Sequence, residues 1–300
     1  MRSENNKLGH LAALFTVIIW GTTFISTKVL LQTFTPVEIL FIRFVIGYLA
    51  LWLIFPKRFK ILDKKHELLF MGAGLCGVTL YFLCENIALN ITFASNVGVI
   101  VSIAPIFTAV LAHLFLNEES LKPTFFLGFL TAIGGIILIS FTSATNLHMN
   151  PLGDFLAVLA ALLWGGYSIF TKKISNLGYS TIGATRKIFF YGILFMIPAL
   201  FIMPVSLDLK ALMIPTNLIN IIFLGLGASA LCYVTWNLAA KHLGAVRVSV
   251  YIYIIPVVTV ATSSIVLKEK ISFLSLVGTL LTILGLVLSE HKHLKKAASK

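Results

Sequence analysis

Long apolar runs alternate with short polar connections over almost the whole chain. A helix needs about 20 apolar residues to cross the roughly 30 Å hydrocarbon core of a bilayer. We expect transmembrane helices near residues 10–31, 36–55, 67–89, 94–116, 123–141, 152–172, 181–203, 217–240, 245–267 and 272–289. The pattern predicts an all-α polytopic membrane protein with ten transmembrane helices.

The chain also repeats part of its own pattern. A Trp-Gly pair followed by Thr-Lys recurs 144 residues later, and a set of Asn, Ala, Pro and Glu recurs 151 residues later. The paired positions are Trp20 and Trp164, Gly21 and Gly165, Thr27 and Thr171, Lys28 and Lys172, Asn86 and Asn237, Ala94 and Ala245, Pro105 and Pro256, and Glu118 and Glu269. Such spacing indicates an internal duplication. We expect two five-helix repeats over residues 8–142 and 150–290, followed by a basic cytoplasmic tail over 291–300.

The composition agrees with a membrane protein. Hydrophobic residues make up 58% of the chain and charged residues only 11%, with a mean hydropathy of +0.99. Soluble domains carry about 25% charged residues. The formal net charge of +12 therefore concerns membrane orientation, and we expect no nucleic-acid partner.

The basic residues fall mainly on one side of the expected membrane. If the N-terminus is cytoplasmic, 18 of the 23 Lys and Arg residues lie in inner segments and four in outer segments, with Arg43 inside a span. The excess predicts a multi-pass protein of the cytoplasmic (inner) membrane with both termini in the cytoplasm. Because each repeat has an odd number of spans, the second repeat is expected to be inverted, as in many secondary transporters.

Several of these residues also resemble a known family. The Trp-Gly pairs early in spans one and six, the run from Ala94 through Pro105 to Glu118, and the later set of Ala245, Pro256, Glu269, Gly278 and Gly285 are similar to the drug/metabolite transporter superfamily, specifically its EamA-type members. The resemblance covers nearly the whole chain. It implies a ten-helix carrier of small metabolites, often an exporter, with a cavity between the repeats. Amino acids or related compounds are the leading expected cargo.

Two charged residues within spans are candidates for the transport site. Glu85 is the one acidic residue well inside an expected span, and Arg43 lies at a similar depth, roughly 8–11 Å below the outer surface at 1.5 Å of helix rise per residue. A charge at mid-bilayer costs about 2.5–3.5 kcal/mol, so each side chain should face a cavity or a partner. They form either a substrate and proton site or a fixed structural ion pair, and both interpretations stay open.

Further candidates are polar or aromatic. Asn86 and Asn237 occupy matching positions and either line the cavity or join helices. Trp20 and Trp164 lie too deep for an interfacial belt and are expected to form aromatic walls. Tyr81, Tyr167, Trp236 and Tyr251 are additional candidates for substrate binding.

The matched prolines Pro105 and Pro256 fall in the middle of expected spans. Each removes a backbone hydrogen bond to the carbonyl four residues earlier and favours a kink. A static bend or a pair of gating hinges would both explain them.

Missing motifs narrow the function further. The sequence has no phosphate-binding Gly-x-x-x-x-Gly-Lys-Ser/Thr motif, no His-Glu-x-x-His motif and no pair of membrane aspartates. We expect no cofactor, no metal and no enzymatic activity, and a secondary transporter with a small-molecule substrate and protons as a candidate coupling ion. Uptake, passive facilitation and, less favoured, a membrane-embedded enzyme are the alternatives. The sequence does not specify the oligomeric state.

Overall fold

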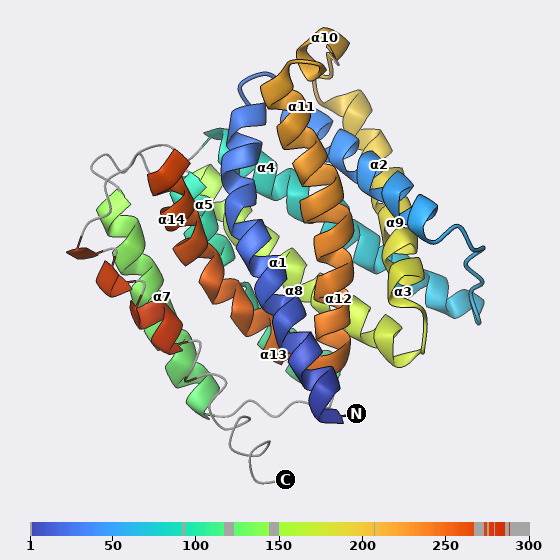
Figure 1. The fold of residues 1–300 in the computed structure, drawn as a ribbon. Helices are drawn as coiled ribbons and strands as arrows, with labels where there is room; N and C mark the ends of the chain where they lie inside the picture. The colour runs from blue at the N-terminus through green and yellow to red at the C-terminus, as the bar shows by residue number, and fades with distance from the viewer. Residues whose placement is uncertain are drawn as a thin grey trace.

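The computed structural model describes residues 2–91, 94–116, 123–143, 150–206 and 208–266, together with residues 273–274, 276–278, 280–285 and 288. Glu118, Glu269 and the expected tail at 291–300 lie outside these described residues. Within them, all regular structure is helical (Figure 1).

The helices follow the apolar runs. They are α1 (Arg2–Leu30), α2 (Pro36–Ile54), α3 (Glu67–Gly74), α4 (Tyr81–Ile91), α5 (Ala94–Val101), α6 (Ala104–Phe115), α7 (Pro123–Ser143), α8 (Pro151–Asn176), α9 (Thr181–Ile202), α10 (Leu209–Leu212), α11 (Pro215–Ile222), α12 (Cys232–Leu243), α13 (Ala245–Ser249) and α14 (Ile255–Val266). Among the described residues, six continuous runs are long and apolar enough to cross a membrane: Asn6–Leu30, Pro36–Ile54, Lys64–Ile91, Pro151–Asn176, Thr181–Ile202 and Pro215–Leu243. The chain is therefore a multi-pass membrane protein. The other four expected spans coincide with shorter apolar helices at Ala104–Phe115, Pro123–Gly135, Ala245–Thr259 and Leu276–Gly285.

Local sequence signals set several helix ends. Thr35 and Glu38 form a reciprocal capping box at the start of α2, where Pro36 occupies the first turn. The Asn150 side chain accepts from two backbone N–H groups at the start of α8. At the far ends, Gly178 follows α8 with a φ of +79° and Gly244 ends α12 with a φ of +94°, a conformation that favours glycine.

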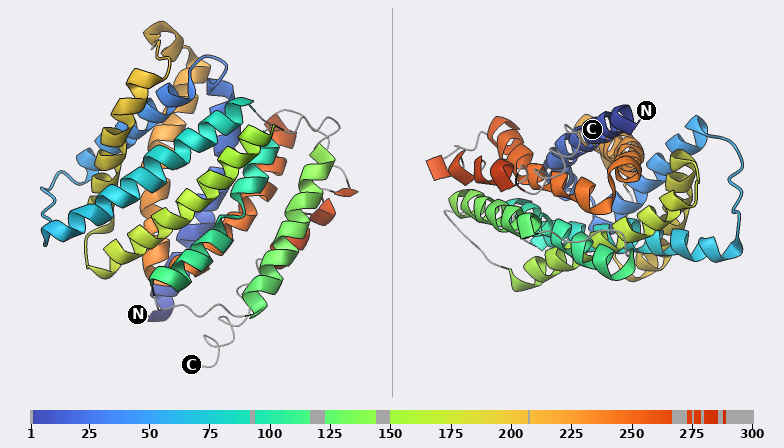
Figure 2. Two further views of the ribbon diagram at one scale, coloured as in Figure 1. Left: turned by 180° about the vertical axis from the view of Figure 1, so that it is seen from behind. Right: turned by 90° about the horizontal axis from the view of Figure 1, so that it is seen from below.

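The two halves of the chain are interleaved. Helix α1 packs mainly against α12 and α14 of the second half, whereas α8 packs mainly against α3, α4, α5 and α6 of the first half. Figure 2 shows α1, α12 and α14 on one side of the molecule and α8, α6 and α7 on the other. Each half thus contributes its first helix to the other half, which brings the two Trp-Gly pairs to the centre.

Two π-helical segments interrupt the long helices. Leu75–Leu80 connects α3 to α4, and Phe223–Leu231 connects α11 to α12. The last residues of the two segments are 151 positions apart, as are the matched asparagines that follow them. Segments of this kind are rare and often occur at functional sites, and the sequence analysis did not anticipate them.

At both matched prolines the helix is interrupted, where the sequence predicted a kink in a continuous helix. The expected span at 94–116 divides into α5 and α6, and the span at 245–267 divides into α13, a 3₁₀ turn at Val250–Ile254 and α14. Pro105 and Pro256 each lie second in the helix that follows the break. The reason is steric, because a proline ring inside a continuous α-helix would clash with the carbonyl four residues earlier.

Candidate substrate cavity

A narrow cavity lies at the centre of the bundle, between the two halves of the chain. Its space between atoms amounts to about 450 Å³, but most of it is too tight for anything beyond a few water molecules. Its lining residues are Trp20, Thr23, Phe24, Arg43, Tyr81, Phe82, Glu85, Val101, Trp164, Ile252 and Ile255. A molecule larger than a few waters therefore fits only if the helices move apart.

Two tryptophans form the aromatic walls. The rings of Trp20 and Trp164 lie 5.1 Å apart and nearly perpendicular, at 87°. Tyr81 extends the wall, with its ring 5.1 Å from that of Trp164. The Trp20 indole N–H donates to the carbonyl of Ala228 at 3.0 Å, whereas the buried Trp164 indole N–H has no partner among the described residues. A substrate carbonyl or carboxylate entering the cavity would supply the missing acceptor.

Arg43 and Glu85 bring opposite charges to the same cavity without forming an ion pair. Their exposed fractions are 1% and 6%, yet no salt bridge within 4.0 Å joins the two side chains. Arg43 donates from Nε to Ser229 at 3.0 Å, and its guanidinium carbon lies 4.4 Å from the centre of the Phe82 ring. Glu85 accepts from the Tyr81 hydroxyl at 3.2 Å.

Each charge therefore keeps unused hydrogen-bonding capacity. The terminal nitrogens of Arg43 and the second oxygen of Glu85 have no hydrogen-bond partner in the part of the chain that the structure describes. A guanidinium can bind a carboxylate through two parallel hydrogen bonds. A carboxylate accepts from an ammonium. The fixed structural ion pair is thus absent from this conformation.

The π-helical segments provide matched backbone acceptors for the aromatic cluster. Tyr233 donates to the carbonyl of Gly77 at 2.5 Å, and Trp20 donates to that of Ala228. Gly77 and Ala228 are 151 positions apart and lie in the two π-helical segments. Because the first bond is donated by a residue of the second half and the second bond by a residue of the first, both tie the halves together across the centre.

A second cavity lies nearer the end of the bundle that carries the N-terminus. Its lining residues are Thr171, Ile174, Ser175, Tyr179, Thr181, Ala184, Ile188, Asn237 and Lys241. Asn237 accepts from the Tyr167 hydroxyl at 2.9 Å and donates to Thr185 at 3.0 Å. The Tyr167 ring lies 4.9 Å from that of Trp164, which lines the central cavity. Tyr167 thus links a residue that lines the central cavity to one that lines the second cavity.

The candidate residues from the sequence divide into two groups. Trp20, Arg43, Tyr81, Glu85 and Trp164 line the central cavity. The others are Asn86, Tyr167, Trp236, Asn237 and Tyr251, and none of these five lines it.

Four of those five outlying residues have other surroundings that the structure shows directly. Asn86 donates to the carbonyl of Pro36 and so ties α4 to α2. Trp236 packs 5.0 Å from the Trp20 ring, and Tyr251 bonds His10 at 2.5 Å. Asn237 faces the second cavity.

Sequence reasoning missed several lining residues. Thr23 and Phe24 lie one helical turn beyond Trp20, so helical spacing on its own could have placed them on the same face. Val101 and Ile252 are 151 positions apart. Each lies four residues before a matched proline, so its backbone carbonyl loses the hydrogen bond that a regular helix would form. Nothing in the sequence pattern indicated Ser229, which holds Arg43 in place.

The comparisons with known proteins agree with this architecture. The model of the EamA-like transporter family matches residues 7–141 and again residues 151–290. An uncharacterized transporter of Archaeoglobus fulgidus is 28% identical over 296 residues, covering 96% of this chain and 99% of the relative. A protein of Escherichia coli K12 described as a probable amino-acid metabolite efflux pump is 27% identical over 285 residues, covering 92% of this chain and 93% of the relative.

The fold agrees with that of a solved structure. One crystal structure superimposes with a TM-score of 0.77 at 18% sequence identity, covering 96% of this chain and 97% of the other. The family and the names of the relatives point to a membrane transporter rather than an enzyme. The chain belongs to the EamA-like transporter family, which confirms the resemblance found in the sequence.

Proposed function

We propose that this chain is a secondary transporter that exports amino acids or closely related metabolites. The observation that carries the proposal is the central cavity, in which a buried guanidinium and a buried carboxylate keep unused hydrogen-bonding atoms between two tryptophan walls. A zwitterion matches this arrangement, because it carries both opposite charges. The E. coli relative described as a probable amino-acid metabolite efflux pump supports the same class of cargo.

In this proposal each group of the cavity has a role. Arg43 binds the substrate carboxylate, and the Trp164 indole N–H donates to one of its oxygens. Glu85 accepts from the substrate ammonium. Trp20 and Tyr81 contact the apolar part of the substrate, which supplies binding free energy at about 25 cal/mol per Å² of apolar surface removed from water.

Transport proceeds by alternating access between two inverted five-helix repeats, residues 8–142 and 150–290. The narrowness of the central cavity supports this mechanism, because substrate entry requires the halves to separate. The breaks before Pro105 and Pro256 supply symmetric hinges beside the cavity residues Val101 and Ile252. Asn237 and the second cavity form the path to the cytoplasmic side. In this proposal the protein lies in the inner membrane and both termini lie in the cytoplasm.

Protons are the coupling ion in this proposal, and Glu85 is the group that carries them. The Glu85 carboxylate would bond Tyr81 when the cavity is empty and the substrate ammonium when the cavity is filled. Its protonation would therefore depend on whether substrate is bound. A Glu85→Gln variant should lose the dependence of transport on a pH gradient. If its transport and pH dependence match those of the unmodified protein, coupling through Glu85 is excluded.

Counterflow in proteoliposomes tests the function. Liposomes containing the purified protein are loaded with one unlabelled amino acid at a time, and the uptake of trace labelled compound is followed. Acidic, basic, aliphatic and aromatic amino acids are compared with the matching amines, which lack the carboxylate. Saturable counterflow of amino acids but not of amines is expected. Unsaturable flux without counterflow would indicate a passive facilitator, and equal movement of the amines would refute carboxylate recognition.

A further inference from the structure

A basic groove lies on the outer surface of the bundle, apart from both cavities. It runs between the last turns of α2, the connection that follows it and the start of α9. Its space, counted with the solvent open to it, is about 810 Å³, against about 450 Å³ for the central cavity. The transport proposal makes no use of this groove.

One wall of the groove is held in place by hydrogen bonds and packing. Arg186 is buried and donates to the backbone carbonyls of Phe55 and Lys57, the latter at 2.7 Å. Phe59 packs against Gly183, where an added Cβ would come within 2.7 Å of the phenyl ring. The connection after α2 is therefore anchored on α9 at two points, which fixes the positions of the residues between them.

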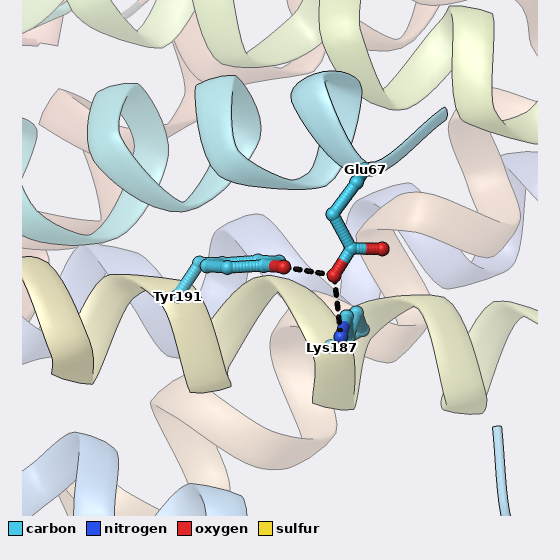
Figure 3. Close-up of polar contacts among 3 residues, drawn as sticks. All are labelled: Glu67, Lys187 and Tyr191. Carbon is cyan, nitrogen blue, oxygen red and sulfur yellow. Dashed lines mark hydrogen bonds and ion pairs between the residues drawn. The ribbon is translucent and has the colours of Figure 1, made fainter. Parts of the chain in front are cut away.

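The charge of the groove is entirely positive. Lys57, Arg58, Arg186 and Lys187 line it, and no acidic side chain does. Lys187 is the one lining cation with an acidic partner, at 2.8 Å from Glu67. Figure 3 shows that Glu67 reaches from α3 towards Lys187 and Tyr191 on α9. Its carboxylate pairs with Lys187 and accepts a hydrogen bond from the Tyr191 hydroxyl.

Two of these cations remain available. Lys57 and Arg58 are exposed, and neither side chain forms a hydrogen bond or ion pair with the described residues. The charge of Lys187 is compensated by Glu67, whereas Arg186 is held by neutral carbonyls and adds a fixed positive potential behind the two available side chains. An anion entering the groove would gain charge-assisted hydrogen bonds from Lys57 and Arg58.

The other side of the groove is aromatic and faces outward. Trp52 is 48% exposed and Phe190 is 44% exposed. Next to Trp52 along α2, Leu53 and Ile54 are 71% and 69% exposed. Exposed apolar residues at the end of a membrane-capable helix lie where acyl chains meet headgroups, and tryptophan is enriched at that level.

We propose that this groove binds one anionic phospholipid, with its phosphate on Lys57 and Arg58 and its acyl chains along Trp52 and Phe190. A soluble phosphate would satisfy the cations but leave the aromatic wall uncovered. A zwitterionic lipid would bring its own cation into a site that already holds three cations without an acidic partner among the described residues. Anionic headgroups in basic pockets between helices follow the same electrostatics.

Lipid retention by the purified full-length protein tests the proposal. Native mass spectrometry counts the phosphatidylglycerol and phosphatidylcholine molecules retained from mixed micelles as each lipid is titrated. The unmodified protein should retain one phosphatidylglycerol in preference to phosphatidylcholine. The double variant Lys57→Gln/Arg58→Gln should bind it at least five-fold more weakly. The matched control Lys172→Gln/Lys173→Gln removes the same charge near the end of α8 and should bind it unchanged.

Three outcomes would overturn the proposal. One is equal weakening in both double variants, which would make the effect one of net charge. Another is equal retention of phosphatidylcholine, which would make the groove a general apolar surface. The third is displacement of the lipid by glycerol phosphate at equal concentration, which would identify a site for soluble phosphates.

Discussion

Gly77 provides a sharp test of the packing at the centre of the molecule. It lies in the first π-helical segment, and a Cβ added there would come 2.1 Å from Cδ2 and 2.4 Å from Cγ of Tyr167. These atoms belong to the base of a fully buried ring that also bonds Asn237, so any shift of the ring disturbs its packing and this hydrogen bond. Overpacking of this kind costs about 1–3 kcal/mol. For Gly77→Ala we expect the apparent Tm to fall by about 2–10 °C.

The matched control lies across the same helix contact. A Cβ added at Gly166 on α8 would meet only Cys76, with its Sγ at 3.7 Å, which is an ordinary contact. Gly166→Ala should therefore leave the Tm unchanged or raise it, since alanine favours the helix by about 0.4–1 kcal/mol. Thermal unfolding of both purified variants in one detergent measures the difference. Equal Tm values, or a larger fall for Gly166→Ala, would refute the packing argument.

Three further predictions follow from the side-chain contacts. Arg43→Gln should weaken binding of carboxylate substrates by about 10- to 150-fold, the equivalent of a charged hydrogen bond of 1.5–3 kcal/mol; competition assays with amino acids and their esters measure this, and equal losses for both would contradict it. Trp20→Phe and Trp164→Phe both remove part of a buried indole and should both lower the unfolding free energy. Trp20→Phe should cost about 1 kcal/mol more, because only Trp20 also loses a hydrogen bond, and Trp164→Phe should weaken substrate binding; identical melting curves for the two would disprove the difference. Glu67→Gln should cost less than about 1 kcal/mol, because its ion pair with Lys187 is partly exposed, at 29% and 24%; a salt titration of the Tm should show the difference shrinking at high salt.

The helices could be predicted from the sequence because hydrophobic length and end signals are local properties. The apolar run at 36–55 and the Thr35 to Glu38 capping pattern define α2 almost to the residue. The π-helical segments could not be predicted, because glycine and small residues there are equally compatible with a regular helix. Their register is set by contacts between distant helices, such as that of Tyr233 with Gly77.

The candidate site was predicted in part for the same reason. An ionisable residue inside an apolar run must face a cavity or a partner, so Arg43 and Glu85 were identifiable. Whether they would face a cavity or pair with each other depended on Ser229 and Tyr81. Ser229 bonds Arg43 and Tyr81 bonds Glu85, so the two charged side chains do not pair. Asn86 illustrates the opposite case, because its matched position suggested the cavity while its hydrogen bond to Pro36 serves helix packing.

The sequence by itself determined the class of protein, the approximate extent of the helices and the residues that could not face lipid. Each follows from the cost of placing polar groups in hydrocarbon, which acts on every segment separately. Only the tertiary structure decided that α1 and α8 are exchanged between the halves, which places Trp20 beside Trp164. It also decided that Arg43 and Glu85 line one cavity without pairing. The physical reason is that side-chain contacts between helices depend on their rotation and tilt, and many helix arrangements bury the same apolar faces equally well.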